Sequence, residues 1–221
     1  MQPCIFVIGW LQVMEYVSLG KTNLLVSRTG FGAESLDCKE IESFGEDADE
    51  KACAIVHQAY AGGMNFFDTS HSKPVCEKRL GAALHGIRQN VILATKTAGQ
   101  DLHEIRRDLD ESLMSLESDT LDLFQLENPL IVPKKNGMDG IYNELLLLKE
   151  KGIVKHIGID QLYAQNALRS CSVSVQHDFA RFSEGSCKIV PGKGSWLYCF
   201  PAIERRSCKR HSIGVWFFVS V

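Results

Sequence analysis

The stretch ADEKACAIVHQAYAGGMNFFDTS (residues 48–70) predicts a helix followed by a buried strand. Apolar residues recur at helical spacing over residues 48–60, acidic residues cluster at the start, and Gly62-Gly63 follows the last turn, as is typical of a capped helix. Residues 64–67 form a short apolar run that ends in the polar group Asp68-Thr69-Ser70. Such a run indicates a buried parallel strand that leads into a loop.

The same alternation of helix and strand continues to residue 160. Helices are expected at residues 77–84, 102–116 and 141–151, and strands at residues 90–94, 120–126 and 154–159. This order implies parallel strands, in either a doubly wound sheet or a closed barrel. Because no G-x-G-x-x-G follows any of these strands, a Rossmann cofactor loop is absent. We therefore predict an α/β fold, a parallel (β/α)8 TIM-type barrel.

Ionisable residues stand at the carboxyl ends of the predicted strands. They are Asp68, Lys96, Glu127 and Asp160. In a parallel barrel these ends share one face, where active sites lie, so we expect the four side chains to form one site. The ends of strands are also where a chain commonly reaches solvent, and this alone explains an ionisable residue at any single strand end.

The composition limits the kinds of molecule that the protein is expected to bind. The chain has 221 residues, 45% hydrophobic residues and a net charge of -3, which fits one or two soluble domains and no nucleic-acid partner. No apolar run approaches the ~20 residues that span a membrane, and the eight cysteines show no CxxC metal motif. We expect a cytoplasmic protein with reduced thiols that acts on a small molecule. The oligomeric state is left open.

The two ends of the chain differ from its centre. Residues 1–13 form a leader that lacks the basic start and the cleavage site of a signal peptide, so we do not interpret it as one. It is either an added edge strand or the product of a misassigned start. Residues 161–221 are basic and show little amphipathic period. This remainder is either a divergent part of the barrel, even a second domain, or a damaged tail.

Several motifs resemble the aldo-keto reductase family. They are LGKTNL (19–24), GFG (30–32), GMNFFDT (63–69), LGAAL (80–84), ATKT (94–97) and GIVKHIGI (152–159), so the resemblance covers about residues 14–160. It implies an eight-stranded barrel closed at its bottom by a hairpin, here residues 16–19 and 24–27. It also implies an enzyme that moves hydride from NADPH to a carbonyl or activated double bond.

The resemblance also assigns catalytic positions. Family members use a tyrosine as proton donor, supported by a lysine, an aspartate and a histidine. Asp68 and Lys96 match the aspartate and the lysine, whereas Lys73 stands where the tyrosine is expected and Glu127 where the histidine is expected. Glutamate also occupies the latter place in a branch that reduces steroid double bonds.

Two explanations of these replacements remain open. In the first, repulsion from Lys96 lets Lys73 donate a proton near neutral pH, or His71 on the same loop does so. In the second, Lys73 and His71 are solvated loop residues and Glu127 pairs with Lys96.

The cofactor positions implied by the family fall late in the chain. Asp160 and Gln161 stand where polar side chains hold the nicotinamide, and Gln176 resembles a glutamine on the sixth strand. Residues 208–215 resemble the entry into a seventh strand, and the barrel is expected to be incomplete at its C-terminus. We expect weak or absent NADPH binding for that reason. The alternative function is a catalytically silent barrel that binds or regulates, or an inactive truncated product.

Overall fold

The computed structural model describes residues 14–19, 22–135 and 137–160, together with the backbone of strands at 179–182, 197–199 and 214–219. Residues 1–13 and most of residues 161–221 lie outside this part. The predicted boundaries at residues 13 and 160 therefore stay predictions.

Among the described residues, eight strands form one sheet in the order β8-β7-β6-β5-β4-β3-β10-β9. The pairs from β3 through β8 are all parallel. The strands are β3 (Thr29–Gly32), β4 (Phe66–Asp68), β5 (Ile92–Thr97), β6 (Leu121–Glu127), β7 (Val154–Asp160), β8 (Phe179–Phe182), β9 (Leu197–Cys199) and β10 (Gly214–Val219).

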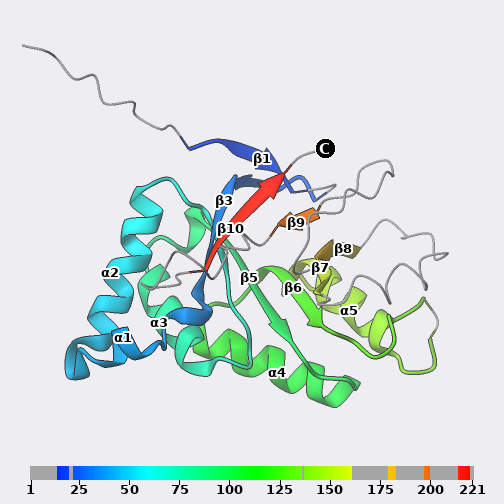
Figure 1. The fold of residues 1–221 in the computed structure, drawn as a ribbon. Coiled ribbons are helices and arrows are strands. Elements are labelled where there is room, and N and C mark those ends of the chain that lie inside the picture. The colour runs from blue at the N-terminus through cyan, green and yellow to red at the C-terminus, as the bar shows by residue number, and fades with distance from the viewer. Residues whose placement is uncertain are drawn as a thin grey trace, which may run out of the picture.

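Helices connect the parallel strands from β3 to β7 and cover the outer side of the sheet (Figure 1). They are α1 (Lys39–Glu42), α2 (Ala48–Ala61), α3 (Pro74–Leu84), α4 (Leu102–Ser115) and α5 (Ile141–Glu150), with the short 3₁₀ turns η1 (Ala33–Ser35), η2 (Gly45–Asp47) and η3 (Arg88–Asn90). Within the described residues, no helix has both the length and the apolar character needed to cross a membrane.

Side-chain alternation along the strands builds two hydrophobic clusters. Phe67, Leu93 and Phe124 pack outward with the helices, whereas Phe66, Ala94 and Leu123 pack inward. The inward cluster also contains Leu19 and Val26 from the antiparallel hairpin of β1 (Tyr16–Ser18) and β2 (Leu25–Ser27). The hairpin therefore closes the amino-terminal end of the barrel interior, and the carboxyl end is left for polar residues.

The predicted fold class and the predicted hairpin are confirmed. Helix boundaries agree closely, and α3 begins at Pro74 rather than near residue 77 because proline suits the first turn of a helix. Lys96 and Thr97 lie within β5 rather than after it.

Two features of the sheet differ from the prediction. β3 was not predicted as a strand, because its sequence TGFG contains two glycines and little apolar character. A seventh barrel strand that begins near residues 208–215 would run parallel to its neighbours. This prediction is wrong for the part that the structure describes, which belongs to β10. β10 runs antiparallel to β3, whose edge away from β4 can pair with a strand of either direction.

Candidate active site

The Lys96 ammonium lies among three carboxylates at the carboxyl end of the barrel. Its Nζ is 2.7 Å from Oε1 of Glu34, 3.1 Å from Oδ2 of Asp160 and 3.9 Å from Oδ2 of Asp68. The lysine side chain is only 2% exposed. We call these four residues the Lys96 cluster.

The strand register explains why these side chains meet. Side chains two residues apart on a strand point to the same face of the sheet. Asp68 therefore faces inward like Phe66 on β4, and Lys96 faces inward like Ala94 on β5. Gln125 pairs in register with Lys96 and donates a hydrogen bond of 3.3 Å from Nε2 to Oδ1 of Asp68. The alternation that packs apolar residues at the bottom of the barrel thus places charged residues at its mouth.

The two strand residues that flank Lys96 fix β5 against the helices. Thr95 donates from Oγ1 to Oε1 of Glu77 on α3 at 2.7 Å, and Thr97 donates to Oδ2 of Asp108 on α4. All four of these side chains are buried. Lys96 is therefore held by a strand that is anchored on both sides.

Glu127 ends β6 beside the cluster. It pairs in register with Asp160, and the Ser70 hydroxyl donates to its Oε2 at 3.5 Å. The structure thus brings together the four strand-end residues that the sequence singled out.

Burial and charge have large effects on the acids at this mouth. Burial raises the pKa of Asp68 to about 8, although the Lys96 charge acts against it. In the same way, burial outweighs the attraction of Lys96 and raises the pKa of Asp160 and of Glu127. For Lys96 itself, burial disfavours the ammonium, but the charges of Asp68, Asp160 and Glu34 outweigh that penalty and raise its pKa. Lys96 therefore remains a cation.

Comparison with known proteins gives the relationship. Residues 28–177 match the model of the aldo/keto reductase family. The chain belongs to this family. It is 35% identical over 67% of its length to the L-galactose dehydrogenase of Arabidopsis thaliana, and 31% identical over 66% to an uncharacterized oxidoreductase of Bacillus subtilis. It covers 49% and 48% of these two proteins, so it spans about half the length of the curated relatives that it matches.

Solved structures agree with this relationship. An aldo-keto reductase from Bacillus halodurans, in its holo form, superimposes with a TM-score of 0.63 at 25% identity. The match covers 78% of this chain and 58% of that one.

In this aldo-keto reductase chain, the residue in the tyrosine position pairs with an acid that is not a member of the Lys96 cluster. The Nζ of Lys73 lies 3.4 Å from Oδ2 of Asp37, on the segment after η1. The ring of His71 lies against α4, with Nε2 3.4 Å from Oδ1 of Asp108 and 3.5 Å from Oε2 of Glu111. Both residues have acidic partners, and the Lys73 side chain is still 42% exposed to solvent.

The predicted cofactor residues have different outcomes. Asp160 points to Lys96, whereas Gln161 and Gln176 lie outside the described residues. Glu34 is the residue that the sequence analysis missed. It lies in η1, two residues after the end of β3, so it would have been found only if this glycine-rich strand had been recognised and the residues just beyond its end had been considered.

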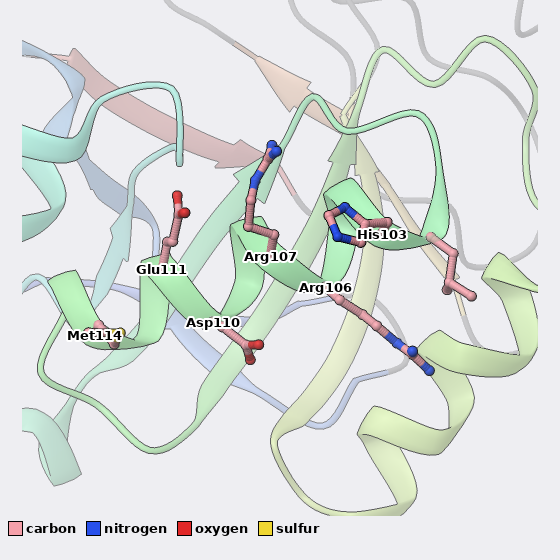
Figure 2. Close-up of a pocket in the computed structure, with 7 residues that line it drawn as sticks. His103, Arg106, Arg107, Asp110, Glu111 and Met114 are labelled. Carbon is pink, nitrogen blue, oxygen red and sulfur yellow. The ribbon is translucent and has the colours of Figure 1, made fainter.

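A hollow on the outer face of α4 lies apart from this site (Figure 2). It is lined by Leu102, His103, Arg106, Arg107, Asp110, Glu111 and Met114. Arg106 donates two hydrogen bonds, of 2.8 and 2.6 Å, to Glu144 of α5. None of the lining residues belongs to the Lys96 cluster, so the hollow adds nothing to the candidate active site.

Proposed function

We propose that this chain carries the catalytic part of an NADPH-dependent oxidoreductase of the aldo-keto reductase type. The reaction is hydride transfer that reduces a small carbonyl compound or an activated double bond, or the reverse. The observation that carries this proposal is the buried pair of Asp68 and Lys96 at the carboxyl ends of neighbouring strands. Family membership and the match to a relative named as a dehydrogenase support it.

The residues at the mouth fit the nicotinamide end of such a cofactor in their chemistry. A nicotinamide carboxamide donates N–H groups, and Asp160 provides a carboxylate oxygen that accepts hydrogen bonds at the end of β7. Gln161 and Gln176 are further proposed partners. The bound cofactor would supply or accept the hydride.

Lys96 would provide the fixed charge of the reaction. Its ammonium is positioned by three carboxylates before any substrate arrives, so no reorganisation is needed during the chemistry. A fixed cation near the reacting oxygen stabilises negative charge that develops there. Its buried position makes this effect stronger than it would be in water.

Two measurements on the full chain test the proposal. NADPH titration followed by cofactor fluorescence should show weak binding that saturates only above the low micromolar range, and a panel of aldehydes and ketones should include at least one that consumes NADPH. Lys96→Met should abolish consumption, while the matched change Lys78→Met at an exposed position should not. Consumption that is equal in Lys96→Met and in the parent would contradict the proposed site.

A silent binding barrel is the second candidate, because Lys73 replaces the family's tyrosine and pairs with Asp37. This candidate predicts that NADPH raises the midpoint of thermal unfolding while no compound in the panel is turned over. Turnover by the parent that is lost in Lys96→Met would exclude it.

A cytoplasmic location is part of the main proposal. Cys38, Cys53 and Cys76 of the described residues are free thiols, which is usual in a reducing compartment.

A further inference from the structure

Glu34 is the exposed member of the Lys96 cluster. Its side chain is 42% exposed, compared with 4% for Asp68 and 11% for Asp160. All three carboxylates contact the same ammonium, and Glu34 exposes the largest fraction of its side chain to a molecule that arrives from solvent. The shortest of the three contacts, 2.7 Å, is also the one that Glu34 makes.

The backbone around Glu34 is fixed. The residue lies in η1 directly after β3, and the preceding Ala33 is fully buried. The Cys76 thiol donates to the Glu34 carbonyl oxygen at 3.5 Å, and the Leu36 amide donates to the Ala33 carbonyl at 2.9 Å. A side chain on such a support is held in place, as an acid or base in catalysis must be.

The other groups considered as proton carriers are engaged elsewhere. Lys73 pairs with Asp37, and His71 lies between Asp108 and Glu111. Asp68 is buried and accepts a hydrogen bond from Gln125.

We propose that Glu34 is the catalytic residue that exchanges the substrate's proton at this site, in the place beside the lysine where relatives use a tyrosine. This inference rests on the function proposed above and adds to it the residue that acts as the general base. It also makes a hydroxyl-bearing compound a substrate for the oxidative direction.

In oxidation, the substrate O–H bond breaks and its proton bonds to a Glu34 carboxylate oxygen. The hydride of the substrate C–H bond, with its electron pair, would be taken up by the oxidised cofactor that Asp160 would help to hold, and the C–O bond would become C=O. The Glu34 carboxyl then releases its proton to water, which its exposed side chain reaches. Reduction follows the same path backward, with protonated Glu34 as the acid.

The cluster's electrostatics suit this role. Burial raises the pKa of Asp68 to about 8, so this carboxyl carries less negative charge near neutral pH than an exposed aspartate does. Glu34 and Asp160 make the two shortest contacts with Lys96, and the Lys96 contact orients the Glu34 carboxylate without burying it.

Steady-state kinetics of Glu34→Gln test the proposal. With an alcohol substrate and oxidised cofactor, kcat should fall by about 10² to 10⁴, the range for a lost general base, while KM changes little. Glu34→Asp, which keeps the carboxylate, should recover part of kcat. The matched control Glu46→Gln removes an exposed glutamate ahead of α2 and should leave kcat unchanged. A Glu34→Gln variant with the parental kcat would overturn the proposal.

A measurement without cofactor separates this inference from the proposed function. In protein labelled with ¹⁵N-lysine, the Lys96 ammonium resonance should shift in Glu34→Gln and stay in place in Glu46→Gln. An unshifted resonance overturns the pairing on which the inference rests. If the parent transfers no hydride with any compound, the proposed function falls and the catalytic role falls with it. If the parent is active and Glu34→Gln matches it, only the role of Glu34 falls.

Discussion

The ammonium of Lys73 lies 3.4 Å from Oδ2 of Asp37, so the residue in the family's tyrosine position forms an ion pair outside the Lys96 cluster. Both side chains are partly exposed, at 42% and 31%. Such pairs add little to stability, typically about 0–1 kcal/mol. A gain in stability from this pair therefore does not explain why lysine stands in the tyrosine position.

Lys73→Tyr should increase carbonyl reduction. A phenol near Lys96 can donate a proton to the developing alkoxide, a contribution on the order of 10² to 10⁴ in rate. We expect the rate of NADPH consumption with an aldehyde to be higher in Lys73→Tyr than in Lys73→Ala. Equal rates in these two variants, with NADPH still bound, would show that the phenol is not what the site lacks.

Lys96→Met should strongly destabilise the fold at neutral pH. The change leaves carboxylates of a buried cluster without their cation, which costs roughly 3–5 kcal/mol in comparable buried pairs. Urea unfolding measures the difference, and Lys78→Met at an exposed position is the matched control. A loss below about 1 kcal/mol would mean that water already screens the cluster.

The pKa of Asp68 predicts a pH dependence of stability. The pKa is raised from 3.8 to about 8, so between these pH values the unfolded chain releases the Asp68 proton and the folded chain keeps it. The unfolded state then binds fewer protons, and this carboxyl's contribution to stability decreases as pH rises through that window and levels off above it. Unfolding free energies in urea should fall less steeply in Asp68→Asn than in the parent. Asp110→Asn, an exposed control, should keep the parental slope, and identical slopes in all three proteins would contradict the assignment.

Asp122 should be a stability residue without a catalytic role. Its buried carboxylate accepts from the Leu93 amide at 2.9 Å and pairs with Arg88 at 2.9 Å and Lys155 at 2.7 Å. Asp122→Ala leaves these donors without their acceptor and should cost about 3–5 kcal/mol in urea unfolding. Exposed Asp119→Ala should change stability by less than about 0.5 kcal/mol. A similar small loss in both variants would show that the donors find water instead.

The sequence predicted the elements whose apolar pattern is long and regular. The helix at 48–61 and the strands that carry Lys96 and Glu127 have apolar runs set by burial, and strand alternation then places their polar ends at one mouth. Asp68 and Lys96 were found in this way.

Other features depend on tertiary contacts that no local pattern records. Glu34 was missed because the strand before it is glycine-rich, and the Lys73–Asp37 pair joins residues 36 positions apart. The position of β10 depends on its pairing with the edge of β3, although the two strands are far apart in the sequence.

Hydride transfer itself is the most direct test of the central claim, that the Lys96 cluster is an aldo-keto reductase active site. The full chain is incubated with NADPH that carries deuterium at the transferable position, together with a panel of aldehydes and ketones, and the products are analysed by mass spectrometry. We expect an alcohol product that contains the deuterium, formed by the parent and by Lys78→Met but not by Lys96→Met. Deuterium in the product of Lys96→Met at the parental rate, or in no product of the parent although NADPH binds, would contradict it.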